Sequence, residues 1–296
     1  MQTIKLLFIT SKLTRRIVQL AKQMDRCGAD VTIAAPMGKS VPFIVQDKYI
    51  RLRKFFGHLY GLGKSHGFKH SVVFDEAATK LANRRNLKKI QFKEEVGIDL
   101  SVWTPQAISG NRQTMLLSQY NVLPHQKLIL AIEPCEKDIS ALITAAEKID
   151  RDDYIIAIYG RLRVYARKRA NRRIAQARNI MYIGIDNDLP SIMRASFAIM
   201  DFSNKTTFFK SAAIAMGRTT AWKGKDPKPN IEIDGSDYTG ALRKILSMSI
   251  DTRERFEQAN LDRAHEFGFD KQIEKIFSLL PGETVKSRRS PKDGYG

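Results

Sequence analysis

The chain has 296 residues, of which 43% are hydrophobic and 27% are charged, and its formal net charge at pH 7 is +19. This composition excludes an intrinsically disordered chain, and the two cysteines, Cys27 and Cys135, exclude a disulfide framework. No apolar run approaches the roughly 18 residues that are needed to span a bilayer. We therefore expect a globular, cytoplasmic protein without a signal peptide.

The positive charge is concentrated in the first third of the chain. Residues 1–100 contain 19 Lys and Arg against 8 Asp and Glu, a balance of +11; the balance is +5 for residues 101–200 (14 against 9) and +3 for residues 201–296 (17 against 14). An excess of this kind favours nucleic acid, anionic lipid or a phosphorylated substrate as partner. Charge alone does not distinguish these three.

The chain begins with a β-α-β pattern. Residues 5–10 and 31–35 are apolar enough for buried strands, and the apolar residues between 17 and 24 recur at helical spacing. We expect the unit to be right-handed and parallel. The loop at residues 11–14 contains no glycine, so it lacks a dinucleotide-binding fingerprint.

Residues 36–70 interleave basic and aromatic side chains. One interpretation is a surface for an anionic partner, with a peripheral membrane contact through residues 48–70 at the inner face of the membrane. The alternative is an amphipathic helix at about residues 46–60 with a solvated basic face. Three histidines occur here without neighbouring cysteines or carboxylates, so we predict no metal site.

The remaining elements follow an α/β order. A strand at 72–74, a helix at 76–82 and a strand at 90–92 precede a linker from about residue 95 to Pro124, where we place a domain boundary. Later strands are predicted at residues 127–132, 154–158, 181–183, 197–200 and 220–222, and later helices at about 139–146, 164–178, 238–248, 251–267 and 270–280.

Several short motifs stand at the ends of these later strands. In chain order they are Glu136-Lys137, Tyr159-Gly160-Arg161-Leu162, Ile180 to Gly184 with Asp188-Leu189-Pro190, Ala195 to Ser203, and Ala212 to Gly217. Their order and spacing over about residues 85–280 resemble the GT-B-fold glycosyltransferases, in particular glycosyltransferase family 4 (glycosyl transferases group 1).

The resemblance implies an α/β fold with two Rossmann-like domains. Residues 1–105 would form a reduced N-terminal domain on the acceptor side, and residues 106–280 the domain that binds the nucleotide sugar. Residues 281–296 would be a disordered basic tail.

The family also implies a donor site at the carboxyl ends of the C-terminal strands, in the cleft between the domains. It needs no metal or cofactor, because cationic side chains and a helix N-terminus neutralise the diphosphate. The implied donor-binding residues are Lys137, Arg161, Gly184, Ser203, Asn204 and Lys210. Lys137 would contact phosphate, Gly184 would lie near the base, and Ser203 would approach the sugar and phosphates. No catalytic residue is assigned.

Three positions depart from the family pattern: Ile132 replaces an arginine, and Asn204 and Ala212 replace two glutamates. One hypothesis is a transferase that acts on a polysaccharide, lipopolysaccharide or glycolipid acceptor. The second is a non-catalytic scaffold or binding subunit of the same fold. The third, a nucleic-acid-binding protein, has no helix-turn-helix, zinc or RNA-binding signature in its favour.

Overall fold

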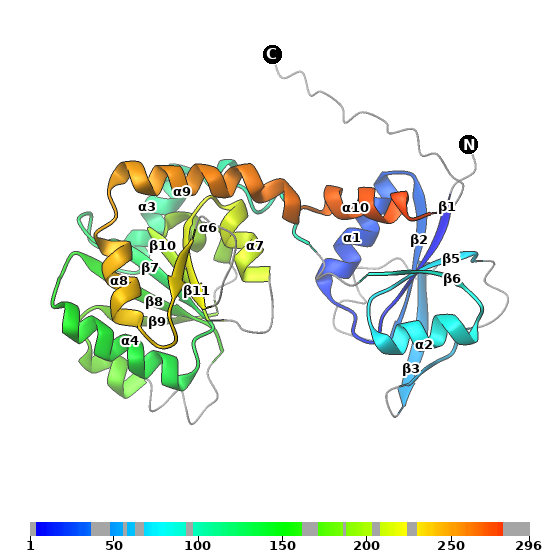
Figure 1. Ribbon diagram of the computed structural model, residues 1–296, viewed down its shortest axis with the longest axis horizontal. Coiled ribbons are helices and arrows are strands. Elements are labelled where there is room, and N and C mark those ends of the chain that lie inside the picture. Colours follow the sequence, from blue (N-terminus) through cyan, green and yellow to red (C-terminus); the bar gives the residue numbers. More distant parts are fainter. Residues whose placement is uncertain are drawn as a thin grey trace, which may run out of the picture. The chain divides into compact units, whose positions relative to one another are not determined.

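The computed structural model describes residues 4–36, 48–55, 58–62, 68–92, 97–161, 171–185, 188–202, 208–223 and 230–280, and the structural statements below concern this part of the chain. It forms two compact units: Met1–Val96 together with Phe269–Gly296, and Gly97–Gly268. Each unit is built on one six-stranded sheet with helices on both faces (Figure 1). The expected α/β fold with two Rossmann-like domains is confirmed. No helix of the described residues combines the length and the apolar character that crossing a membrane requires.

The sheet of the first unit has the strand order β4-β3-β2-β1-β5-β6, and all neighbours are parallel except β3 and β4. Its strands are β1 (Ile4–Ile9), β2 (Ala29–Pro36), β3 (Tyr49–Phe55), β4 (His58–Tyr60), β5 (His70–Val73) and β6 (Lys88–Gln91). Strands β2, β3 and β4 therefore lie on one side of β1 in the sheet, and β5 and β6 lie on the other side.

In the described residues, three helices cover this sheet. They are α1 (Arg15–Arg26), α2 (Glu76–Arg84) and α10 (Phe269–Ser278). Residues of α1 and α10 share one apolar cluster with β1 and β2, whereas α2 packs in a second cluster on the opposite face with β4 and β5. The predicted β-α-β start is therefore confirmed as a parallel pair, β1 and β2, with α1 between them in the chain.

The described residues of the basic and aromatic stretch include two strands, Tyr49–Phe55 and His58–Tyr60. The alternative of an amphipathic helix at residues 46–60 is wrong, because β3 and β4 form an antiparallel pair there. Leu52 and Leu59 are buried, while Arg51, Arg53 and Tyr60 are exposed, so the period of the pattern is that of a strand.

The division between the units differs from the expected one after residue 105. The second unit begins at Gly97, and the N–H of Ile98 donates to Phe267 O (3.0 Å) at its other end. Helix α10, which sequence analysis assigned to the second domain, lies in the first unit because Phe269, Ile273 and Ile276 are buried in the core beneath β1. The expected tail, residues 281–296, lies outside the described residues.

The sheet of the second unit has the order β12-β11-β10-β7-β8-β9, with all neighbours parallel. Its strands are β7 (Lys127–Ile132), β8 (Tyr154–Tyr159), β9 (Ile180–Gly184), β10 (Ala198–Asp201), β11 (Thr219–Lys223) and β12 (Ile231–Ile233). Counted from β7, this is the strand order 3-2-1-4-5-6 of the Rossmann fold. The chain reverses direction across the sheet between β7 and β10.

The helices of the second unit form two layers (Figure 1). They are α3 (Gly110–Gln119), α4 (Glu136–Ile149), α6 (Leu189–Ala195), α7 (Phe208–Ala215), α8 (Tyr238–Leu246) and α9 (Ile250–Arg263), with short 3-10 turns at Pro105–Ala107 and Ala264–Phe267. Helices α4 and α8 cover one face of the sheet, and α3, α6 and α7 cover the other. The region expected as a linker thus contains a helix, α3, whose Arg112 pairs with Asp188 at the start of α6.

Candidate functional site

The carboxyl end of the second sheet, where β7, β8, β9 and β10 terminate, is the candidate site. Strands β7 and β10 are neighbours, but their connections run to opposite sides of the sheet. In open α/β sheets this topological switch point leaves a crevice, which is where such folds bind ligands. The segments that follow Ile132 and Asp201 therefore border the candidate site.

Backbone hydrogen bonds bring the strand ends together. Glu133 N donates to Tyr159 O (2.7 Å), Gly160 N donates to Gly184 O (2.9 Å), and Phe202 N donates to Ile132 O (3.0 Å). These bonds continue the parallel ladders by one residue beyond each strand. The segments after β7, β8, β9 and β10 thus leave the sheet along one line.

The backbone is unusual at two neighbouring residues, Glu133 after β7 and Gly160 after β8. Glu133 has φ of +51°, a conformation that costs a non-glycine residue energy. Gly160 has φ of +145°, and a Cβ at this position would lie 3.1 Å from Glu133 Cα. A glycine at 160 therefore allows the turn after β7 to approach the end of β8, and Tyr182 Oη fixes it by donating to Gly160 O (2.8 Å).

Three residues separate β7 from helix α4, which presents its amino end at the switch point. The unbonded N–H groups of the first turn give such an end a partial positive charge. The N-cap is Cys135, which is exposed and whose N–H donates to Asp138 Oδ2 (3.0 Å). Lys223 Nζ, at the end of β11, and Tyr238 Oη, at the start of α8, both contact Asp138 Oδ1, at 3.1 and 2.5 Å.

The structure places two of the predicted cations at this end of the sheet. Lys137 is exposed in the first turn of α4, and Arg161 is exposed two residues beyond β8. Within the described part of the chain neither forms a hydrogen bond or an ion pair, so both charges are available to an anion.

The remaining predicted donor residues have different outcomes. Gly184 ends β9 with φ of +72°, within the line of strand ends. Lys210 lies in the first turn of α7 with Nζ 4.5 Å from the centroid of the Trp222 ring, so it forms a cation–π contact with the protein's own strand β11. Ser203 and Asn204 lie outside the described residues.

Two positions at which the chain departs from the family are buried. Ile132 and Ala212 are both completely inaccessible to solvent, and both belong to one apolar cluster between the sheet and helices α3, α6 and α7. The two positions at which the resemblance would place an arginine and a glutamate therefore lie in the same packed layer. Charge for a bound anion must come from residues that remain exposed, such as Lys137 and Arg161.

The corresponding switch point of the first unit is occupied by a carboxylate. Asp75 follows β5, caps α2 by accepting from Ala78 N (2.9 Å), and accepts from Ser11 N (2.6 Å) in the turn after β1. A loop N–H that an anion could use is therefore bound to the protein itself. His70 begins β5 of this first sheet, whereas His125 is exposed just before β7, at the amino end of the second sheet.

Among the described residues no group of three or more His, Cys, Asp or Glu side chains is arranged to hold a metal ion.

Comparison with solved structures identifies the fold. A glycosyltransferase from Rickettsia africae matches with a TM-score of 0.78 at 13% sequence identity, covering 94% of this chain and 98% of its own. Anabaena HepE in complex with UDP and glucose matches with a TM-score of 0.65 at 10% identity (94% and 100% covered), and the lipopolysaccharide glycosyltransferase WaaG with 0.62 at 11% (94% and 100%). This chain has the GT-B fold. The GT-B fold that the resemblance implied is thereby confirmed.

Comparisons by sequence find no such match. No protein-family model matches the chain, and no curated protein does. Identities of 10–13% establish the GT-B fold and do not by themselves transfer an activity.

Sequence reasoning missed Lys223 and Tyr238, the two partners of Asp138. Asp138 itself carries a local signal, since a carboxylate at the third position of a helix often accepts from the N-cap N–H. Lys223 and Tyr238 lie 85 and 100 residues away and have no such signal. Only the parallel arrangement of β7, β10 and β11 brings them to the start of α4.

Proposed function

We propose that this GT-B-fold chain is a glycosyltransferase whose second unit binds a nucleotide-sugar donor at the carboxyl end of its sheet. The observation that carries the proposal is the amino end of α4 at the β7–β10 switch point, flanked by the exposed, unpaired charges of Lys137 and Arg161. A helix N-terminus and cationic side chains are what a diphosphate requires, because its charge must be offset when the glycosidic bond to the sugar breaks. HepE has been crystallised with UDP and with UDP-glucose, and a structural neighbour from Escherichia coli is bound to UDP-2-fluoro glucose, which supports testing uridine nucleotides first.

Ligand binding to the intact protein tests this proposal. We expect UDP or a UDP-sugar to raise the melting temperature, because a ligand that binds only the folded state stabilises it. Lys137→Ala should weaken the affinity for UDP about tenfold, which corresponds to about 1.4 kcal/mol for one lost phosphate contact. Lys148→Ala, an exposed lysine in the last turn of the same helix, is the matched control. If no nucleoside diphosphate or nucleotide sugar shifts the transition at millimolar concentration, the donor site is not there.

The acceptor side of the proposal is a polysaccharide, lipopolysaccharide or glycolipid, approached at the inner face of a membrane. It is supported by the exposed face of the β3–β4 pair. Arg53 is paired with Tyr60 across the two strands, and Arg51 and His58 lie on the same face by alternation. All four are exposed, and the Arg84 guanidinium stacks on the Tyr60 ring at 5.2 Å from its centroid.

Sedimentation with lipid vesicles tests this contact. Binding to vesicles that contain phosphatidylglycerol should weaken as salt rises, since it depends on charge. The double variant Arg51→Glu, Arg53→Glu should abolish it, while Lys22→Glu, Arg26→Glu on α1 should not. If both double variants bound the vesicles equally well, the β3–β4 face would not be the membrane contact. Preference for nucleic acid over vesicles would favour the third hypothesis instead.

A second candidate function is a non-catalytic subunit of the same fold. It is supported by the buried, apolar character of Ile132 and Ala212, where the resembling family carries charged residues. A protein of this kind would bind a nucleotide sugar or a partner without turnover. Release of UDP from UDP-sugars in the presence of membrane extract distinguishes the two: binding without release at any enzyme concentration favours the subunit.

A further inference from the structure

The amino end of α4 carries negative as well as positive charge. Its first turn contains Glu136 and Asp138, and Glu133 precedes it in the turn after β7. Carboxylates in the first turn stabilise a helix, but they also compete with an external anion for its positive end. Offsetting one of these negative charges within the protein therefore favours the binding of a diphosphate at this helix end.

Asp138 is one of these carboxylates, and its side chain is largely buried. Its side chain is 13% exposed, and its two oxygens accept from three donors of separate elements: Cys135 N at the cap of α4, Lys223 Nζ of β11 and Tyr238 Oη of α8. Tyr238 is itself buried and packs edge-to-face on Phe202, the residue that follows β10, with ring centroids 5.3 Å apart. The cluster therefore joins α4, α8 and two strands at the candidate site.

The ionisation of the pair follows from these contacts. Burial acts to raise the pKa of Asp138, but hydrogen bonds from Cys135, Tyr238 and Lys223 outweigh it, and the pKa lies below its ordinary value. For Lys223, burial acts to lower the pKa, and the contacts with Tyr238 and Asp138 raise it on balance. At neutral pH the two groups are an anion and a cation that offset each other.

We propose that Lys223 is a positioning residue for the diphosphate of a bound nucleotide. It acts through Asp138: by pairing with this carboxylate from the β11 side, Lys223 cancels the negative charge that otherwise opposes a second anion at the start of α4. The inference rests on the proposed function, because it assumes that the diphosphate lies at this helix end. Lys223 itself need not touch the ligand.

A double-mutant cycle with UDP as the probe tests this electrostatic role. Lys223→Met leaves Asp138 without its cation, and we expect the affinity for UDP to fall about tenfold or more, as for an uncompensated charge a few ångströms from the site. Asp138→Asn removes the opposing charge, so it should bind UDP at least as tightly as the wild type. The double variant Lys223→Met, Asp138→Asn should recover the wild-type affinity to within about threefold.

Controls separate this role from simple packing. Lys244→Met, an exposed lysine of α8, should bind UDP as the wild type does, and Lys223→Arg, which keeps the charge, should remain close to it. The inference is overturned if Lys223→Met binds UDP normally, or if the double variant binds as weakly as Lys223→Met. Should Lys223→Met fail to fold, a tenfold loss of affinity in folded Asp138→Asn overturns it as well.

The wild type separates this inference from the function on which it rests. If wild-type protein binds no nucleoside diphosphate, the proposed function fails and the role of Lys223 fails with it. If wild-type protein binds UDP and the cycle shows no recovery, only the role of Lys223 fails.

Discussion

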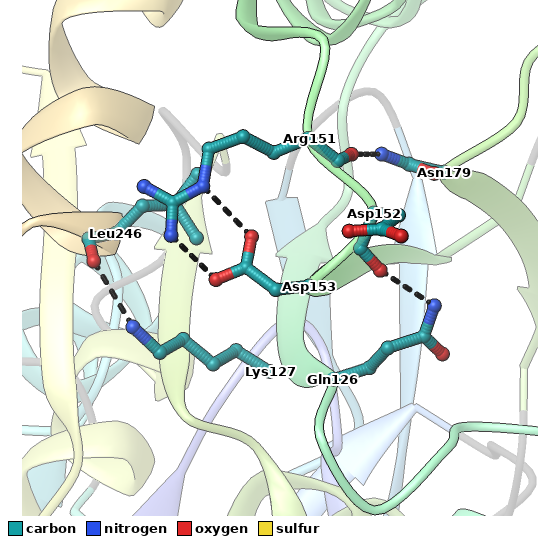
Figure 2. A network of polar contacts seen from close by, with 7 residues as sticks. All are labelled: Gln126, Lys127, Arg151, Asp152, Asp153, Asn179 and Leu246. Atoms are coloured by element: carbon teal, nitrogen blue, oxygen red, sulfur yellow. Dashed lines mark hydrogen bonds and ion pairs between the residues drawn. The ribbon is translucent and has the colours of Figure 1, made fainter.

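The two ends of the second sheet are built from the same six strands but are organised in opposite ways. At the amino end, where β7, β8 and β9 begin, charges are paired and close together. Figure 2 shows Arg151 bound to Asp153 through two hydrogen bonds of 2.8 and 2.5 Å, and Lys127 Nζ donating to Leu246 O (3.0 Å) at the end of α8. At the carboxyl end, Lys223 pairs with Asp138, but Lys137 and Arg161 are exposed and unpaired in the described structure.

At the amino end, side-chain amides also donate to backbone carbonyl groups. In the same network Gln126 donates to Asp152 O (2.9 Å) and Asn179 donates to Arg151 O, so the turns before β7, β8 and β9 are tied to one another (Figure 2). Further along this end, Arg218 before β11 is buried and pairs with Glu257 of α9 at 3.2 Å. The charged side chains described at the amino end are thus engaged in contacts that stabilise the fold, whereas two cations at the carboxyl end, Lys137 and Arg161, have no such contact in the described structure.

The largest effect on stability is expected at the amino end. Burial, together with Arg194 and Arg253, lowers the pKa of Arg218 to about 10 against the opposing effect of Glu257, so the guanidinium is still charged at neutral pH. Glu257→Ala would leave this buried charge without its carboxylate and should reduce the free energy of unfolding by about 3–5 kcal/mol. Urea denaturation measures it, with the exposed Glu254→Ala on the same helix as control; a loss below about 1 kcal/mol would show that the pair is not a stabilising element.

The next largest effect is expected at Gly160, which lies against Glu133 in the turn after β7. Gly160→Ala places a Cβ 3.1 Å from Glu133 Cα at φ of +145°, so we expect a loss of about 1–3 kcal/mol in stability and weaker UDP binding together. Gly110→Ala, at the open start of α3, is the control and should be neutral or slightly stabilising. Normal UDP binding in a destabilised Gly160→Ala would separate the turn after β7 from the ligand site.

A substitution of Arg161 should affect ligand binding and leave stability unchanged, whereas a substitution of Glu257 should reduce stability. Arg161→Ala removes an exposed, unpaired charge, so the free energy of unfolding should change by less than about 0.5 kcal/mol. The dissociation constant for UDP, measured by calorimetry, should rise about tenfold, or about 1.4 kcal/mol. Arg178→Ala, an exposed arginine just before β9 at the amino end, should change neither quantity. If Arg161→Ala destabilised the fold without altering binding, the contrast between the two ends would be lost.

The smallest effect concerns the acid stability of the amino end. Hydrogen bonding from Arg151 lowers the pKa of Asp153 despite partial burial, so its stabilising contribution is fully present above its ordinary pKa and is lost as the pH falls through the lower folded value. Asp153→Asn should therefore reduce the free energy of unfolding at pH 6, by no more than about 1 kcal/mol because the pair is partly exposed. Near pH 3 the reduction should be smaller, and thermal denaturation at the two pH values measures the difference. Asp152→Asn, whose side chain takes no part in the network, should follow the wild type at both pH values.

Local patterns in the sequence predicted much of this structure. Apolar runs bounded by turn residues placed β1, β2, β7, β8 and β10, and helical spacing placed α1, α4, α8 and α10. The strand-end motifs placed Lys137, Arg161 and Gly184 at one end of one sheet. Residues 46–60 could not be decided in this way, because alternating basic and aromatic residues suit a helix face or an edge strand, and only the pairing of β3 with β4 selects the strand.

What the sequence determined by itself is therefore the order of strands and helices, the GT-B resemblance and the identity of the exposed cations, because these depend on neighbouring residues in the chain. What only the tertiary structure decided depends on residues far apart. It placed α10 against the first sheet, buried Ile132 and Ala212 in one apolar layer, and brought Lys223 and Tyr238 to Asp138. The physical reason is that parallel strands joined by crossovers set distant segments side by side, and no local pattern records which ones.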